Sequence, residues 1–399
     1  MKEHLAVVLG MFETGLAVGR SLGRAGIRVL GLDTVKKVGF HSKYIAPRVC
    51  PHPTQCEEEF LAFLLRIAKD ETRPPALFIT SDEFLLPVSR NRDRLETRYL
   101  MNLPSPQILE CISDKYKQYS LALEAGIPVP RTYLPENMEA LNELIDEIPF
   151  PAFIKGAEVT TWRRKMGVAT KGFVVSTREE LRNTFRRIFE QGVNGLIQEI
   201  IPGPDTNHYK SSCYVSRNGL ILLAFGLQKI RQQPAGFGFG CLVQSVLYPE
   251  MLRLGKDFFS RIGYRGVGSA EFKLDPRDGK LKLIELNPRY WQQNALAARC
   301  GMNFPLTDYG ELTGEAPEPK NEYRPGIKWV NFYSDIESFR EYRRRGEITW
   351  GGWLASYKGE FMLSDLDWDD PFPGIREAVI ENGIRRSGRY LGKVFGGGH

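Results

Sequence analysis

The chain has 399 residues, 42% of them hydrophobic and 26% charged, a composition typical of a globular protein with about two or three domains. The formal net charge of +6 comes from 54 basic and 48 acidic residues that are interspersed, which favours small anionic ligands and no nucleic-acid partner. The six cysteines form no Cys-x-x-Cys pair, and no apolar run approaches the ~18 residues that span a bilayer. These features exclude a disulfide framework, a zinc site and a membrane span, and they favour a cytoplasmic protein.

The N-terminal region begins with an apolar strand over residues 5–9, a glycine turn from Gly10 to Gly15, a helix, and a second strand that ends at Asp33. This order predicts a doubly wound parallel sheet whose first helix N-terminus faces an anionic ligand. The Gly-x-x-x-x-Gly spacing differs from the Gly-x-Gly-x-x-Gly spacing of dinucleotide sites. We therefore expect a ligand other than nicotinamide, and a nicotinamide-dependent oxidoreductase is the less favoured alternative.

Residues 76–80 repeat the strand-to-loop pattern and place Asp82 near the same edge of the sheet. After a break over residues 104–112, a helix begins at Ser113 and Lys115, so we expect a domain boundary near residue 112. A lysine in the first turn is unfavourable for the helix dipole, which suggests that Lys115 meets an anion. A plain surface lysine is the alternative.

Two further apolar strands precede the middle of the chain. The first, residues 150–155, ends at Lys155, and the second, residues 196–201, runs into a proline-stiffened turn that ends at Asp205. Later, Lys229 and Arg231 share the parity of one strand face, ahead of a glycine-rich segment over residues 235–240. We interpret that segment as a flexible loop over an active site, with a structural loop and two exposed bases as the alternative.

The stretch from Gly268 to Tyr290 predicts a hairpin, because two alternating strands flank turn residues. A loop over residues 276–280 would place Glu271 opposite Glu285. Facing carboxylates repel unless a cation lies between them, and Asn287 adds an amide oxygen on the same face. Such oxygen ligands suit Mg²⁺ with phosphate completing its shell. A solvated hairpin is the alternative.

Arg289 falls two residues beyond Asn287 and would offer a planar donor fork to a phosphate or carboxylate. From Ser113 to Arg289, the order of motifs resembles the ATP-grasp superfamily of ATP-dependent carboxylate ligases. The basic strand end and the turn over residues 200–205 are similar to the D-aspartate ligase-like branch, whose members join an amino-acid carboxylate to an amine. The resemblance implies an ATP-grasp fold of α/β and α+β parts, with ATP and Mg²⁺ as cofactors and a small-molecule carboxylate and an amine as substrates.

The resemblance also implies roles for individual residues. Two lysines would bind phosphates, a hinge would meet the adenine, and an acid would accept from the ribose: Lys115, Lys155, Gln198, Glu199, Ile200, Ile201 and Asp205. The implied metal ligands are Glu271, Glu285 and Asn287. The implied catalytic residues are Arg289, which would hold the transferring phosphoryl group or the tetrahedral intermediate, and the basic strand end with Lys229 and Arg231.

One departure from the family concerns residues 160–167, which replace its small glycine-rich loop with one glycine and three bases. Phosphate would then be held by side chains more than by backbone N–H groups. A nucleotide-binding interaction protein without turnover is therefore the other alternative. Beyond residue 305 the resemblance fades, so we expect an extension that is a third packed layer or an acceptor or partner surface, and a homo-oligomer stays open.

We expect the following division of the chain: an N-terminal doubly wound domain over residues 1–112, a linker helix and small nucleotide subdomain over 113–205, a larger subdomain with the metal site over 206–315, a C-terminal extension over 316–395, and a tag remnant over 396–399.

Overall fold

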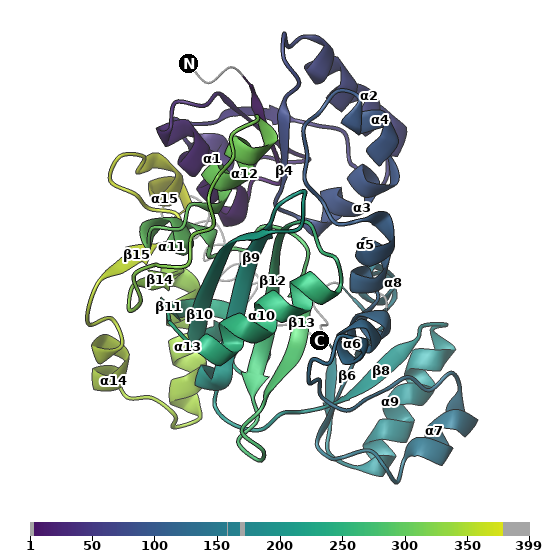
Figure 1. The fold of residues 1–399 in the computed structure, drawn as a ribbon. Coiled ribbons are helices and arrows are strands. Elements are labelled where there is room, and N and C mark those ends of the chain that lie inside the picture. Colours follow the sequence, from purple (N-terminus) through teal and green to yellow (C-terminus); the bar gives the residue numbers. More distant parts are fainter. Residues whose placement is uncertain (1–3, 158, 168–171, 378–399) are drawn as a thin grey trace, which may run out of the picture.

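Three sheets follow one another along the chain and organise its fold (Figure 1). The structure is a computed structural model that describes residues 4–157, 159–167 and 172–377. Within these ranges no helix has the length and apolar character needed to cross a membrane. All six cysteines are free thiols, as their scatter predicted.

The first sheet is parallel, with strand order β3-β2-β1-β4, and confirms the predicted doubly wound region. The strand order reverses between β1 and β4, so the loops after these two strands diverge at one edge. Gly10 has a φ of +95°, and a Cβ there would lie 2.9 Å from the Ser81 Cβ, so only glycine fits this junction. The elements of this region are β1 (Ala6–Leu9), α1 (Glu13–Arg24), β2 (Val29–Asp33), η1 (Val38–His41), β3 (Ala46–Val49), α2 (Glu57–Lys69), β4 (Ala76–Ile79), α3 (Asp82–Arg90) and α4 (Arg92–Glu96).

A pair of helices leads to the second sheet, which is antiparallel with order β5-β8-β6-β7. The predicted break over residues 104–112 is itself mostly helical, because Ser105 caps a helix that opens with Pro106. The Asp114 side chain accepts from two backbone N–H groups and begins the next helix at Lys115. The elements are α5 (Pro106–Ser113), α6 (Lys115–Glu124), β5 (Thr132–Tyr133), α7 (Met138–Leu144), β6 (Ala152–Gly156), α8 (Val159–Met166), β7 (Phe173–Val175), α9 (Arg178–Glu190) and β8 (Gly195–Glu199).

The third sheet has seven strands in the order β13-β12-β9-β10-β11-β14-β15. Its last two strands come from the segment that the sequence placed in a separate extension: β14 pairs antiparallel with β11, and β15 pairs parallel with β14. The expected boundary at residue 315 therefore divides one continuous sheet. The elements are η2 (Asp205–Asn207), β9 (His208–Val215), β10 (Ile221–Gln233), β11 (Phe239–Ser245), α10 (Pro249–Arg261), β12 (Gly266–Leu274), β13 (Leu281–Asn287), α11 (Asn294–Arg299), α12 (Phe304–Leu312), β14 (Lys328–Val330), α13 (Phe332–Arg344), α14 (Trp350–Ala355), β15 (Phe361–Leu363) and α15 (Phe372–Arg376).

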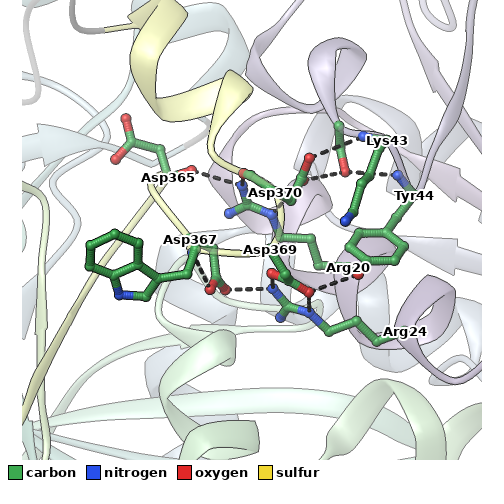
Figure 2. A network of polar contacts seen from close by, with 10 residues as sticks. Arg20, Arg24, Lys43, Tyr44, Asp365, Asp367, Asp369 and Asp370 are labelled. Atoms are coloured by element: carbon green, nitrogen blue, oxygen red, sulfur yellow. Dashed lines mark hydrogen bonds and ion pairs between the residues drawn. The ribbon is translucent and has the colours of Figure 1, made fainter.

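An acidic segment after β15 attaches the end of the described chain to the first helix, α1 (Figure 2). Asp370 is buried and accepts from Arg20 Nε at 2.9 Å and from Ser42 Oγ at 2.6 Å. Arg24, one turn further along α1, binds the carboxylates of Asp367 and Asp369 on the exposed side. The two arginines thus link the N-terminal sheet to the far end of the third sheet.

A second buried polar group joins β9, α12 and the segment after β13. The Asp308 carboxylate accepts from Tyr290 Oη at 2.8 Å and from Tyr214 Oη at 3.0 Å, and Tyr214 also contacts Glu311. Burial raises the pKa of Asp308 from its ordinary value of 3.8 to about 7, although the two hydroxyls oppose that shift. The folded chain therefore favours the protonated carboxyl.

Because the folded-state pKa of Asp308 is raised, its protonation stabilises the fold fully below about pH 4, and that contribution is lost as the pH rises to about 7. We expect Asp308→Asn to remove this loss, so that the wild type weakens relative to the variant by roughly 3 kcal/mol over that interval. Denaturant unfolding of both proteins at several pH values measures the difference. Parallel pH profiles would contradict the expectation.

Candidate active site

The β12–β13 hairpin has the predicted register at its facing glutamates, whereas next to the turn Leu274, and not Asp275, pairs with Leu281. Glu271 lies opposite Glu285, and Ser269 lies opposite Asn287. One feature was not predicted: Phe272 pairs with Leu283, so Ile284 is an extra residue on β13 next to the facing glutamates. The two carboxylates are thus adjacent across the ladder at a local irregularity.

Two lysines neutralise Glu271. Lys210 lies opposite it on β9, with 3.0 Å between Nζ and Oε1, and Lys229 on β10 approaches Oε2 at 3.2 Å. Burial opposes ionisation of Glu271, but the two ammonium groups outweigh burial and hold its pKa well below the usual range. The sequence reasoning missed Lys210. Pairing β9 with β12 in register, with opposite charges across the ladder, is the signal that would have found it.

A third lysine neutralises Glu285. Lys115, in the first turn of α6, places Nζ 2.6 Å from Glu285 Oε1, and only 13% of its side chain is exposed. Burial raises the pKa of Glu285 and Lys115 lowers it, with a net shift below the ordinary value. Lys115 therefore meets an anion, as its unfavourable place in the helix dipole suggested.

Lys155, the other lysine implied to bind phosphate, lies on β6 and has a different environment. Its Nζ donates to Gln198 Oε1 at 2.9 Å and to Tyr119 Oη at 2.6 Å, and within the described ranges it forms no ion pair. Burial, followed by the charge of Lys115, lowers the pKa of Lys155 to about 7. Among the described residues Lys155 is thus held by neutral partners, although Glu285 is near enough to act on its pKa.

The hinge residues comprise the last two residues of β8, Gln198 and Glu199, and the two that follow it, Ile200 and Ile201. The Glu199 N–H donates to the Arg131 carbonyl at 2.9 Å, and its carboxylate pairs with Arg277 at 2.6 Å. Ile200 is partly exposed and Ile201 is buried. The Glu199 N–H is therefore already used within the protein, and an adenine contact for the hinge backbone stays a prediction.

Asp205 begins the short helix η2 beyond the hinge. Its carboxylate accepts from the Gly236 N–H at 3.2 Å and contacts the hydroxyl of Tyr342 on α13. Phe237, in the same loop, stacks on Phe153 of β6 with ring centroids 4.7 Å apart. The glycine-rich loop therefore lies against the nucleotide subdomain, and a ribose contact for Asp205 stays a prediction.

Arg231 is not brought together with the other predicted residues. The register of β10 against β11 shifts on both sides of Arg231, and its guanidinium forms two 2.8 Å bonds with Asp335 of α13. Asp335 is fully buried and also accepts from Trp353 Nε1 at 2.8 Å. The shared parity predicted that Arg231 and Lys229 lie on one strand face, but the register shifts on both sides of Arg231, and its side chain binds α13 instead.

We expect Asp335→Asn to destabilise the fold by roughly 3 kcal/mol, since it leaves the buried Arg231 guanidinium without a counter-charge. Asp257→Asn is the matched control, because it removes an exposed i,i+4 pair with Arg253 and should cost less than about 0.5 kcal/mol. Urea unfolding measures both. Equal losses would show that the Arg231–Asp335 pair contributes no more than a surface pair.

Arg289 connects the hairpin to the N-terminal sheet. Its Nε and Nη2 atoms bind the two carboxylate oxygens of Asp82 at 2.6 and 2.8 Å. Asp82 begins α3, just after β4, so Arg289 joins the carboxyl edge of the parallel sheet to the β12–β13 hairpin. The sequence placed Asp82 at this edge, and the structure supplies its partner.

The expected phosphate loop over residues 160–167 is occupied by helix α8, which covers Val159–Met166. Lys165, one of its three bases, donates to the carbonyls of Gln191 and Gly192 beyond α9. This base therefore caps a helix end, and the following residues 168–171 lie outside the described part.

Within the described ranges, no group of three or more His, Cys, Asp or Glu side chains gathers to hold a metal. Two facing carboxylates with a nearby amide oxygen, Glu271, Glu285 and Asn287, nevertheless match the way Mg²⁺ is bound when substrate phosphates complete its shell. This all-oxygen donor set fits magnesium and lacks the nitrogen and sulfur ligands that dominate structural zinc sites.

Comparisons with known proteins agree with this geometry. No family model matches the chain. It is 26% identical to D-aspartate ligase of Enterococcus faecium over 317 residues, which is 76% of this chain and 75% of that protein. It is 25% identical to pyruvate carboxylase of Schizosaccharomyces pombe over 203 residues, 47% of this chain and 16% of that protein.

Solved structures with the same fold include N5-carboxyaminoimidazole ribonucleotide synthetase in its ADP complex, with a TM-score of 0.63, 14% identity, and coverage of 81% of this chain and 80% of that chain. Another is L-amino acid ligase from Bacillus licheniformis, with a TM-score of 0.60, 15% identity, and coverage of 82% and 78%.

The chain has the ATP-grasp fold of these solved structures, which include complexes with ADP and with its magnesium salt. In sequence it is similar, over 76% of its length, to D-aspartate ligase.

Proposed function

We propose that this chain is an ATP- and Mg²⁺-dependent ligase, which joins the carboxylate of an amino acid to an amine through an acyl phosphate and releases ADP and phosphate. The observation that carries the proposal is the facing pair Glu271 and Glu285 surrounded by the cations Lys115, Lys210 and Lys229. Similarity to D-aspartate ligase makes aspartate the first carboxylate to test.

Each group has a chemical task in this proposal. Magnesium held by Glu271, Glu285 and Asn287 would neutralise phosphate charge. Lys115 and Lys155 would bind the phosphates of ATP, which leaves Arg289 and Lys229 for the transferring phosphoryl group. Arg231 holds α13 in place and takes no part.

Two displacements follow from these placements. A substrate carboxylate oxygen bonds to the γ-phosphorus as the bond to ADP breaks. The amine nitrogen then bonds to the acyl carbon, phosphate leaves, and the proton of the amine passes to water. Lys115 and Arg289, whose pKa values are raised by neighbouring carboxylates, carry their charge before either step, so they stabilise the developing charge without rearranging.

A nucleotide-binding protein without turnover is the second candidate, and helix α8 in place of a glycine-rich phosphate loop favours it. ADP release separates the two. We expect ADP formation that depends on both Mg²⁺ and a carboxylate, measured over D- and L-amino acids singly and in pairs, starting with D-aspartate. Nucleotide binding without ADP formation across the whole panel would support the second candidate.

We expect Glu285→Gln to lower the turnover number about 100-fold or more, because it removes a charged metal ligand and leaves Lys115 without its ion pair. Glu250→Gln, an exposed acid at the start of α10, is the control and should leave turnover unchanged. ADP release over a magnesium titration measures both. A Glu285→Gln enzyme with wild-type turnover at ordinary magnesium would refute the metal-site assignment.

A further inference from the structure

Tyr119 occupies a junction of three elements beside the proposed phosphate site. It lies one turn beyond Lys115 on α6, and 2% of it is exposed. Its hydroxyl accepts a 2.6 Å hydrogen bond from Lys155 Nζ of β6 and donates to the Ile284 carbonyl of β13. One hydroxyl therefore joins the linker helix, the nucleotide subdomain and the metal hairpin.

The partners of Lys155 are neutral. Besides Tyr119, its Nζ contacts only Gln198 Oε1 among the described residues, and the Gln198 amide is fixed in turn by Thr132 Oγ1 at 3.0 Å. The charged groups that act on it are Lys115 on α6 and Glu285 on β13. A partly buried ammonium with neutral partners is held in position yet keeps its charge available to an incoming anion.

The acceptor of the Tyr119 hydroxyl lies next to one of the facing glutamates. Ile284 is the extra residue of β13, and Glu285 follows it directly. The Ile284 carbonyl accepts a hydrogen bond from the Tyr119 hydroxyl. Because the same hydroxyl accepts from Lys155, the position of Lys155 is linked to the backbone next to Glu285, a proposed metal ligand.

We propose that Tyr119 is a positioning residue, which fixes the Lys155 ammonium for the phosphates of ATP and couples it to the metal hairpin. The inference rests on the proposed function, because that function supplies the phosphate. It assigns a role to a hydroxyl, and phenylalanine at the same place would keep the ring, over which Lys155 Nζ lies 4.8 Å from the centroid, and lose the hydrogen bond.

The contact also has a charge signature. The Tyr119 hydroxyl accepts from the ammonium form of Lys155, whose pKa lies at about 7 instead of 10.5. Losing that acceptor disfavours the charged form and lowers this pKa further. Tyr119→Phe should therefore shift the pH dependence of ATP binding toward lower pH, whereas a loss of packing alone would leave it in place.

The experiment compares Tyr119→Phe with Tyr116→Phe on the same helix, since Tyr116 is 40% exposed and its hydroxyl has no hydrogen-bond partner among the described residues. Calorimetric titration with Mg·ATP between about pH 6 and pH 9 should show about 10-fold weaker binding for Tyr119→Phe and a shifted pH profile. Tyr116→Phe should match the wild type. In the steady state, the KM for ATP should rise more than kcat falls.

Unfolding without nucleotide tests the same contact separately. Tyr119→Phe should destabilise the fold more below about pH 7, where Lys155 is charged, than near pH 10. Binding and pH profiles equal to those of Tyr116→Phe, with a stability loss that does not vary with pH, would overturn the role of Tyr119. A wild type that binds no ATP would refute the proposed function, and the unfolding comparison would still decide whether Tyr119 holds Lys155.

Discussion

Two carboxylates that face each other across the β12–β13 ladder set the main constraint on this structure. Alone, Glu271 and Glu285 would repel and weaken the hairpin. The chain meets the constraint with cations from three other elements: Lys210 from β9, Lys229 from β10 and Lys115 from α6. These ion pairs hold the neighbouring strands and the linker helix α6 to the hairpin, and in the proposed function the same lysines lie around the bound phosphate.

The N-terminal sheet contributes to this arrangement through one contact. Its carboxyl edge, at the reversal of strand order between β1 and β4, is where an α/β sheet binds ligands, and Asp82 lies at that edge. Arg289 binds both carboxylate oxygens of Asp82 and therefore joins the sheet edge to the β12–β13 hairpin. The Arg20–Asp370 pair joins α1 to the segment after β15 (Figure 2). The N-terminal region is therefore tied to the rest of the chain at both places.

Local chemistry explains which parts of this structure could be predicted from the sequence. Turn residues and alternation predicted the pairing of Glu271 with Glu285, and the glycine turn with its flanking strands predicted the N-terminal sheet. The addition of β14 to the third sheet depends on β11, more than 80 residues earlier in the chain. The extra residue Ile284 and the shifted register around Arg231 are local irregularities that leave no periodic signal. Lys210 was missed for a related reason, since its meaning depends on pairing β9 with β12.

The balance of charge in the site explains why nucleotide binding and hairpin geometry should be linked. Five cationic side chains meet three carboxylates there: Lys115, Lys155, Lys210, Lys229 and Arg289 against Asp82, Glu271 and Glu285. An excess of positive charge around partly buried groups is unfavourable until an anion arrives, so phosphate should relieve a cost that the free protein bears. Lys155 carries that cost most directly, because its partners are neutral and its pKa is lowered to about 7. Binding phosphate would restore its charge, and through Tyr119 the same event would act on the backbone next to Glu285.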